Sequence, residues 1–131
     1  ERIKCQIGAA TMPDGTGQEL SVKGRHLVSG RPSELTISEL EVAEALREPI
    51  GQIVAAVRAA LEQIAPELAA DIMDQGITVT GGGALLRRID QALSEATGLS
   101  VNIADDALMC VAKGAGATLE DPVYAGVLHS A

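Results

Sequence analysis

The sequence predicts an α/β fold, and three observations support this prediction. The second half alternates in the order helix, strand, glycine loop, helix, strand, helix. A hairpin pattern precedes it over residues 18–37. Hydrophobic residues make up 47% of the 131 positions and aromatic residues only 1%, so the core must be aliphatic. We therefore expect one domain of ordinary size, with helices packed on the faces of a small parallel or mixed sheet.

The first elements are expected to be a helix and a β-hairpin. Ile3 and Ile7 are four residues apart, which is helical spacing, and no capping residue precedes them. We therefore expect the chain to begin inside a helix of a longer protein. Residues 12–17 carry the Pro, Asp and Gly of a turn. Residues 18–25 and 33–37 alternate apolar and polar side chains, which predicts two strands with one covered face.

Two helices are expected after the hairpin. Ser38 and Glu41 have the spacing of a capping box, which predicts a helix over residues 39–47. Pro49 is expected to end or kink that helix and to suit the first turn of the next one. The next helix is strongly amphipathic, and its apolar side chains are Ile50, Ile53, Val54, Val57, Leu61 and Ile64.

The second half is expected to place a glycine loop between a strand and a helix. A short helix over residues 66–74 would end at Gly76 as its C-cap. Residues 77–80 are rich in β-branched side chains and run directly into Gly81, Gly82 and Gly83. Glycines here either let a ligand approach the backbone or simply form a tight turn, and both interpretations remain open. The loop matches neither a P-loop nor the GxGxxG pattern.

The remaining elements complete the alternation. A helix resumes at Ala84 and ends at Gly98, and residues 100–103 form the next strand. Asp105 or Asp106 would cap a last helix over residues 107–119. Residues 121–131 show no clear helical or strand periodicity of apolar side chains, so we expect an irregular tail.

Composition and charge disfavour several classes of function. The net charge of -8 and the scattered basic residues disfavour binding to nucleic acid or to anionic lipid. The near absence of aromatic residues disfavours base stacking. The sequence shows no signal peptide and no apolar stretch long enough for a bilayer. Cys5 and Cys110 are expected to be free, buried thiols, with a disulfide as the alternative.

Other chemically capable residues give weak signals, so we predict no catalytic and no metal-ligating residue. His26 and His129 have no partner at metal-binding spacing and are expected on the surface. Arg87 and Arg88 either face a phosphate or lie on a solvated helix face, and the second is favoured. An acidic ridge on the first long helix is expected to face solvent, and its members are Glu41, Glu44 and Glu48.

A series of segments resembles the MreB family of bacterial actin homologues, which determine rod shape. The segments occur in the family's order, and they are ERIK (1–4), ALREPI (45–50), PELA (66–69), DI (71–72), TGGGALLR (80–87), EATG (95–98) and CVAKGAG (110–116). The resemblance implies the actin-like fold, in which two α/β lobes enclose an ATP cleft, and this chain resembles the C-terminal lobe only. Residues 1–48 would be a peripheral subdomain of helix, hairpin and helix, and residues 49–120 the inner α/β subdomain.

The resemblance also implies site residues and a cofactor. Gly81, Gly82 and Gly83 would pack against the adenosine side of ATP or ADP, and Glu1 and Lys4 would reach the nucleoside from the other flank. In the full-length relative the nucleotide would be bound with Mg. The phosphate-binding hairpins and the water-positioning residue have no counterpart in this sequence. We therefore expect no ATPase activity and weak or no nucleotide binding from this chain alone.

The function implied is that of a segment of an ATP-binding, cytoplasmic filament protein that scaffolds cell-wall synthesis. The implied partners are further copies of the chain and the cell-wall elongation machinery, with no nucleic acid. No direct membrane insertion is expected from this segment. Residues 18–37 and 39–75 are candidate filament surfaces, and residues 1–12 or the tail are candidates for self-association. Two alternatives stay open: a stand-alone capping or docking module, and a lobe of a chaperone or sugar kinase of the same superfamily.

Overall fold

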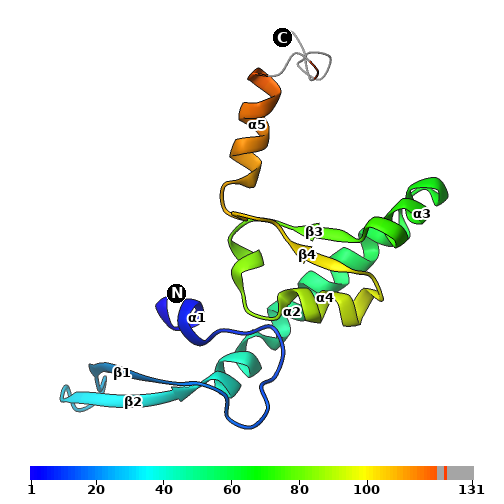
Figure 1. Cartoon of the computed structure of the whole chain (residues 1–131). Helices are drawn as coiled ribbons and strands as arrows, with labels where there is room; N and C mark the ends of the chain where they lie inside the picture. The colour runs from blue at the N-terminus through cyan, green and yellow to red at the C-terminus, as the bar shows by residue number, and fades with distance from the viewer. Residues whose placement is uncertain (121–122, 124–131) are drawn as a thin grey trace.

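The computed structural model describes residues 1–120 and residue 123, so the predicted tail lies almost wholly outside the described residues. Helices and strands alternate along the chain (Figure 1). In order they are α1 (Arg2–Ile7), β1 (Glu19–Arg25), β2 (Pro32–Ser38), α2 (Glu39–Glu62), α3 (Pro66–Gln75), β3 (Ile77–Val79), the 3-10 helix η1 (Gly82–Leu85), α4 (Ile89–Thr97), β4 (Val101–Ile103) and α5 (Cys110–Glu120).

The strands form two separate pairs, which confirms the predicted α/β class. β1 and β2 are an antiparallel hairpin in which Val22 lies opposite Leu35. β3 and β4 are parallel, with Ile77 opposite Val101, and α4 is the crossover between them. One face of the hairpin was expected to be covered. It is only partly covered, because Leu35 on that face is 64% exposed.

The hydrophobic core lies where α2 crosses α4 and the parallel pair (Figure 1). Ile50 from α2 and Ile89 and Leu93 from α4 are its buried residues. Partly buried aliphatic side chains surround them, and these are Ala10, Leu46, Val54, Val57, Val79, Leu86, Ala92 and Val101. The core is therefore aliphatic, as the composition requires.

The predicted helix end at Pro49 is wrong, because α2 is one helix of 24 residues with Pro49 inside it, whereas the alternative of a kink there stays a prediction. Proline removes one backbone hydrogen bond, to the carbonyl four residues earlier. Both Pro49 and Ala45 are exposed, so water can hydrate that carbonyl. Apolar residues before and after the proline, Leu46 and Ile50, pack in the same core and hold the helix together. The predicted boundary between residues 48 and 49 therefore falls within one helix, and the division into subdomains stays a prediction.

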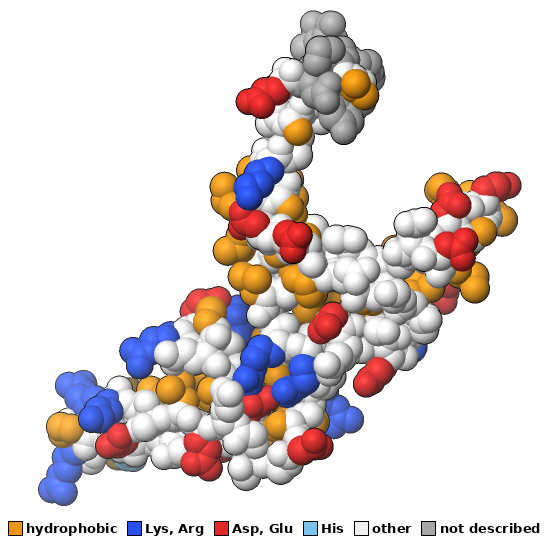
Figure 2. Space-filling model, in the orientation of Figure 1, with side chains coloured by type: hydrophobic (Ala, Val, Ile, Leu, Met, Phe, Trp, Pro, Cys, Tyr) orange, Lys and Arg blue, Asp and Glu red, His pale blue; other side chains and the backbone are white. Residues whose placement is uncertain are grey.

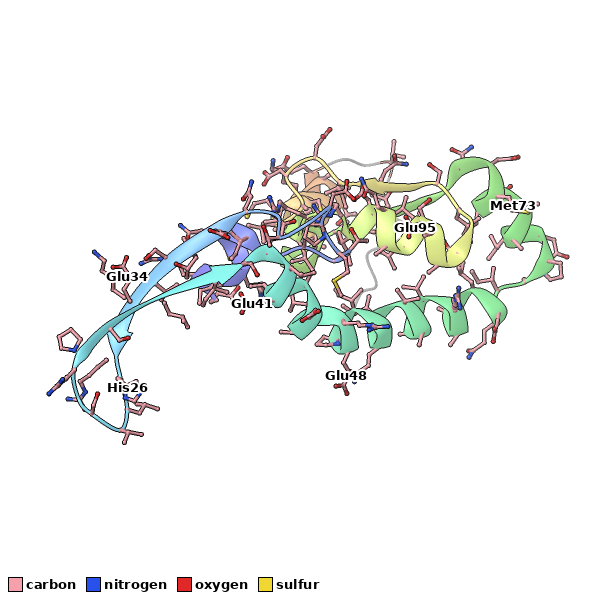
Figure 3. All side chains as sticks on the ribbon, turned by 90° about the horizontal axis from the view of Figure 1, so that it is seen from below. His26, Glu34, Glu41, Glu48, Met73 and Glu95 are labelled. Atoms are coloured by element: carbon pink, nitrogen blue, oxygen red, sulfur yellow. The ribbon has the colours of Figure 1, made fainter. Side chains whose placement is uncertain are left out.

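The start of α2 matches the prediction in detail. The Ser38 hydroxyl accepts a hydrogen bond from the Glu41 amide at 3.2 Å, and the Glu41 carboxylate accepts one from the Ser38 amide at 2.8 Å. This is the expected capping box. The Ser38 interactions lower the pKa of Glu41. Glu41, Glu44 and Glu48 are exposed, and Figure 3 shows Glu48 pointing away from the body of the molecule.

Two helices begin later than predicted. The helix expected from Ala84 is instead the short η1, followed by a break and then α4 from Ile89. The last helix begins at Cys110, and the Asp106 side chain does not cap it but forms an ion pair with Lys113 at 2.5 Å. Both cysteines are free, as expected. Cys110 is partly buried but Cys5 is exposed, so the prediction of two buried thiols is wrong for Cys5.

Helices α3 and α5 extend from the body with apolar side chains uncovered (Figures 1 and 2). Met73 on α3 is 75% exposed, and Val111 and Leu119 on α5 are 71% and 73% exposed. Neither helix contributes a residue to the buried core. No helix among the described residues is long and apolar enough to cross a membrane.

Candidate functional site

The glycine loop is a tight connection between β3 and η1. Gly81 has a φ of 80°, which glycine adopts without steric cost. Its amide donates to the Ala107 carbonyl at 2.7 Å, which ties the loop to the segment after β4. Its carbonyl accepts from the Ala84 amide at 3.2 Å and so closes the first turn of η1. The loop is thus held at both ends by backbone hydrogen bonds.

The outer surface of this loop is open. A Cβ atom placed on Gly81 or Gly83 would meet no atom within 4 Å, and one on Gly82 would meet only the Leu108 side chain at 3.5 Å. In the described part of the chain, no acceptor is recorded for the amides of Gly82 and Gly83. A ligand can therefore approach the backbone of both residues closely and accept hydrogen bonds from them.

Glu1 and Lys4 form an ion pair with each other, at 2.9 Å between Oε1 and Nζ. The side chains are 78% and 47% exposed. The Lys4 ammonium lowers the pKa of Glu1, and the Glu1 carboxylate raises that of Lys4. No contact between this pair and the glycine loop is recorded among the described residues. The pair is free to rearrange toward a ligand because an exposed ion pair is weak.

A backbone connection nevertheless joins the end of α1 to the region after the glycine loop. Ala9 and Arg87 form a parallel β-bridge, and the Ala10 amide donates to the Arg87 carbonyl at 2.8 Å. Ala9 is completely buried there. The structure thus joins the segment after α1 to the segment after η1, and the placing of Glu1 and Lys4 in one site with the glycines stays a prediction.

Sequence reasoning missed a buried carboxylate, that of Glu39 in the first turn of α2. Its side chain is only 3% exposed and lies between two arginines. Arg88 pairs with Oε1 at 2.5 Å and Arg87 with Oε2 at 2.6 Å, and the Gln18 amide donates to Oε2 at 3.1 Å. The Arg88 and Gln18 hydrogen bonds outweigh burial and lower the pKa of Glu39 to about 2. Glu39, Arg87 and Arg88 are called the Glu39 clamp below.

The clamp explains why the helix does not resume at Ala84. Arg88 has a φ of 60°, a left-handed conformation that is unusual outside glycine. Its guanidinium donates to the Thr11 hydroxyl at 2.8 Å and to the Thr11 carbonyl at 2.9 Å, besides pairing with Glu39. These contacts stabilise the break before α4. The favoured prediction of a solvated Arg87–Arg88 face is therefore wrong.

No sequence pattern could have found the clamp reliably. Glu39 looks like an ordinary acidic residue in a first helical turn, where it favours the helix dipole. Its partners lie almost fifty positions away, and periodicity within an element carries no information on such pairing. The only hint was two adjacent arginines in a chain with an excess of acids.

A groove of about 460 Å³ lies between α2 and the segment after α1, and its lining residues are Ala10, Thr11, Met12, Ala43, Arg47, Ile50, Gly51 and Val54. A hollow of about 240 Å³ lies on the hairpin, beside His26 and Leu35. His26 is exposed as expected, and His129 lies outside the described residues. In the described range, no group of three or more His, Cys, Asp or Glu side chains could hold a metal ion.

Comparison with known proteins gives consistent matches. The family model described as MreB/Mbl protein matches residues 1–125. The chain is 51% identical over 120 residues to the cell shape-determining protein MreB of Escherichia coli strain K12, covering 92% of this chain and 34% of that protein. It is 45% identical over 121 residues to the cell shape-determining protein Mbl of Bacillus subtilis strain 168, covering 92% of this chain and 36% of that protein. The chain thus spans about a third of the length of these curated relatives.

Two crystal structures of MreB5 from Spiroplasma citri match the fold. The structure bound to ADP superposes with a TM-score of 0.84 at 36% identity, covering 96% of this chain and 38% of that one. The structure bound to AMPPNP gives a TM-score of 0.81 at 37% identity, covering 95% and 38%. These matches confirm the predicted fold, and they favour neither a chaperone nor a sugar-kinase lobe.

Proposed function

Because this chain belongs to the MreB/Mbl family, we propose that it is part of an actin-like cytoskeletal protein that determines cell shape. In this proposal it supplies the lobe that carries the adenosine side of the nucleotide site. The open glycine loop is the observation that carries the proposal, since a Cβ at Gly81 or Gly83 would meet open space and no acceptor is recorded for the Gly82 and Gly83 amides among the described residues. That MreB5 was crystallised with ADP and with AMPPNP supports a nucleotide as the ligand.

In this proposal Gly81, Gly82 and Gly83 pack against the adenosine and α-phosphate side of the nucleotide. Glu1 and Lys4 exchange their mutual ion pair for contacts with the nucleoside: the carboxylate accepts from ribose hydroxyls and the ammonium donates to ring or ribose acceptors. A magnesium ion would neutralise the phosphates in the whole protein, held outside this chain. The residues of this chain only bind and orient the nucleoside.

We further propose that hydrolysis belongs to the whole protein and that this chain alone does not hydrolyse ATP. Phosphoryl transfer needs a positioned water, a metal and aligned phosphates together. Contacts from one side of a cleft offset the cost of association poorly, so the nucleotide affinity expected here is weak, with a Kd of about 1 mM.

Assembly is the second part of the proposal. Copies of the whole protein would form cytoplasmic filaments that scaffold the cell-wall elongation machinery. The apolar side chains exposed on α3 and α5 support self-association, because uncovered apolar patches of this kind favour contact with partners. Sedimentation equilibrium at rising concentration should therefore show species larger than a monomer, and a monomer throughout would contradict this part.

Nucleotide titration tests the site. We would follow backbone amide chemical shifts during addition of ADP to the chain and to a Gly83→Val variant. A Cβ at Gly83 meets no atom within 4 Å, so the valine should leave the fold intact while blocking the loop. The expected result is shifts confined to residues 81–86 and 1–4 that the variant abolishes.

Gly24→Val is the matched control, because a Cβ at Gly24 also meets open space but lies on the hairpin, in a strand that favours valine. This control should bind ADP like the unchanged chain. Shifts spread over other surfaces, or equal shifts in the Gly83→Val variant, would refute the proposed site. So would an absence of shifts at about 10 mM ADP, ten times the expected Kd.

A further inference from the structure

The two arginines that follow η1 are bonded to the segment that follows α1. The Arg87 carbonyl accepts from the Ala10 amide at 2.8 Å, and Arg87 Nε donates to the Gly8 carbonyl at 3.4 Å. The Arg88 guanidinium donates to the Thr11 hydroxyl at 2.8 Å and to the Thr11 carbonyl at 2.9 Å. Figure 1 shows the chain after α1 passing the start of α4, where these bonds lie. The backbone that leaves α1 is therefore fastened to the backbone that leaves the glycine loop.

A single buried carboxylate holds both arginines in place. The Glu39 side chain is 3% exposed, and it pairs with Arg87 through Oε2 at 2.6 Å and with Arg88 through Oε1 at 2.5 Å. It is itself fixed at the base of the hairpin, because the Gln18 amide donates to Oε2 at 3.1 Å and the Glu39 amide donates to the Gln18 carbonyl at 2.7 Å. Hydrogen bonds between charged groups are stronger than neutral ones and add geometric specificity. The carboxylate therefore fixes where the two guanidinium groups lie.

The Glu39 clamp lies close to the glycine loop along the chain. Only residues 84–86 separate Gly83 from Arg87. This short segment is held by its own turn, since the Leu86 amide donates to the Gly83 carbonyl at 3.1 Å, and Leu86 packs against the core. A displacement of the arginines is therefore passed on to the glycines. The clamp anchors the loop on this side, and the backbone bond of Gly81 to the segment after β4 anchors it on the other.

We propose that Glu39 is a positioning residue for nucleotide binding: through Arg87 and Arg88 it holds the glycine loop and the end of α1 at the spacing that the nucleoside needs. This inference rests on the proposed function and adds to it a support that lies outside the glycine motif. Glu39 acts through the backbone and not by contact with the ligand, because its carboxylate is buried and is occupied by the two arginines and the Gln18 amide. Groups that are already held in place need not be ordered when a ligand binds, which improves affinity.

The backbone of Arg88 favours positioning over stability alone as the role of the clamp. Its φ of 60° is a left-handed conformation, which costs free energy in a residue other than glycine. If the break before α4 served stability alone, a glycine at this position would supply it without strain. Strain of this kind persists where the surrounding contacts enforce it, and it is concentrated at functional sites. Here the contacts that enforce it are those with Glu39 and Thr11.

Titration of the whole chain with ADP tests the inference. Backbone amide shifts would give the Kd for the unchanged chain and for Glu39→Gln near neutral pH, with circular dichroism to verify that each is folded. We expect Glu39→Gln to raise the Kd about fivefold, which corresponds to a loop that keeps its binding geometry about a fifth of the time. Arg88→Gly is the second variant, because glycine keeps the φ of 60° without strain and removes the guanidinium. It should weaken binding by a similar factor, and it carries the test if Glu39→Gln does not fold.

Two controls separate positioning from a general loss of stability or charge. Ser38→Ala weakens the start of α2 beside Glu39, but Ser38 has no recorded contact with either arginine in the described chain. Glu44→Gln removes an exposed carboxylate from the same helix. Both variants should bind ADP with the Kd of the unchanged chain, because a folded chain that is merely less stable keeps its site.

Amide hydrogen exchange without nucleotide gives a second readout. The Ala10 and Leu86 amides donate to the Arg87 and Gly83 carbonyls, so they report whether the two segments stay fastened. In Glu39→Gln their exchange should speed up about tenfold more than that of Val57 in the middle of α2, whereas Ser38→Ala should show no such difference.

The outcomes distinguish this inference from the proposed function. If Glu39→Gln and Arg88→Gly bind ADP as tightly as the unchanged chain, the clamp has a structural role only and the inference is overturned. An equal weakening by Ser38→Ala would also overturn it. An absence of shifts in the unchanged chain would refute the nucleotide site itself and with it the nucleoside role of Glu39. The exchange rates would then still show whether the clamp holds the loop, and uniform exchange would refute that as well.

Discussion

Substitution of Glu39 should destabilise the protein and remove a specific part of its pH dependence. The change is Glu39→Gln, which keeps the size of the side chain and removes its charge. In the native structure the carboxylate is 3% exposed and meets Arg87, Arg88 and the Gln18 amide. The amide of glutamine cannot accept from all three, so two guanidinium groups lose their anion.

The magnitude follows from the pKa. Folding lowers the pKa of Glu39 from 4.5 to about 2, and each pKa unit corresponds to about 1.4 kcal/mol. The ionised carboxylate thus adds at most about 3 kcal/mol to the free energy of unfolding. The side chains of Arg87 and Arg88 are 37% and 28% exposed, so water can replace part of the interaction that their guanidinium groups lose with the carboxylate. We therefore expect Glu39→Gln to lower the free energy of unfolding by about 2 kcal/mol near neutral pH.

The sign of the pH dependence is fixed by the direction of the shift. Because folding lowers the pKa, the stabilisation is complete above a pH of about 4.5 and is lost as the pH falls toward 2. Urea unfolding of the unchanged chain and of Glu39→Gln, measured between pH 7 and pH 3, should show a difference that shrinks over that interval. Comparing the two proteins cancels the contribution of the other carboxylates.

Glu44→Gln is the matched control, since Glu44 lies on the same helix, is exposed and has no recorded ion pair in the described chain. It should change the free energy of unfolding by less than about 0.5 kcal/mol. A difference between the unchanged chain and Glu39→Gln that stays constant from pH 7 to pH 3 would refute the reasoning. So would equal effects of the two variants.

Two further predictions concern the backbone. Ser38→Ala removes the side-chain cap of α2 and should lower the free energy of unfolding by about 1 kcal/mol in urea titrations; no change would mean that the capping box contributes nothing. Gly76→Ala places a Cβ 2.4 Å from the Ser100 carbonyl oxygen at a φ of 78°, so we expect a loss of at least about 2 kcal/mol. Gly24→Ala, where the added Cβ meets open space, should lower the free energy of unfolding far less in the same urea titrations. Equal losses of stability in the two variants would contradict the steric argument.

Much of the local structure could be predicted from the sequence, because its causes lie within a few residues. The capping box at Ser38 and Glu41 predicted where α2 begins, and the positive φ at Gly76 fits its predicted role in ending α3. The alternation of apolar residues predicted the hairpin. The run of three glycines predicted the connection between β3 and a helix but left open whether it binds a ligand, and its ligand contacts remain a proposal.

Features that depend on distant segments were decided only by the tertiary structure. Pro49 reads locally as a helix end, yet the core contacts of Leu46 and Ile50 carry α2 through it. Arg87 and Arg88 read locally as a solvated helix face, yet Glu39 and Thr11 hold them in a break between two helices.

The sequence by itself determined the fold class, the family resemblance and the order of the elements. Only the tertiary structure decided which charges are buried together and which apolar side chains stay uncovered. The physical reason is that helix and strand patterns arise from periodic interactions between near neighbours, whereas ion pairs and burial depend on residues brought together from far along the chain.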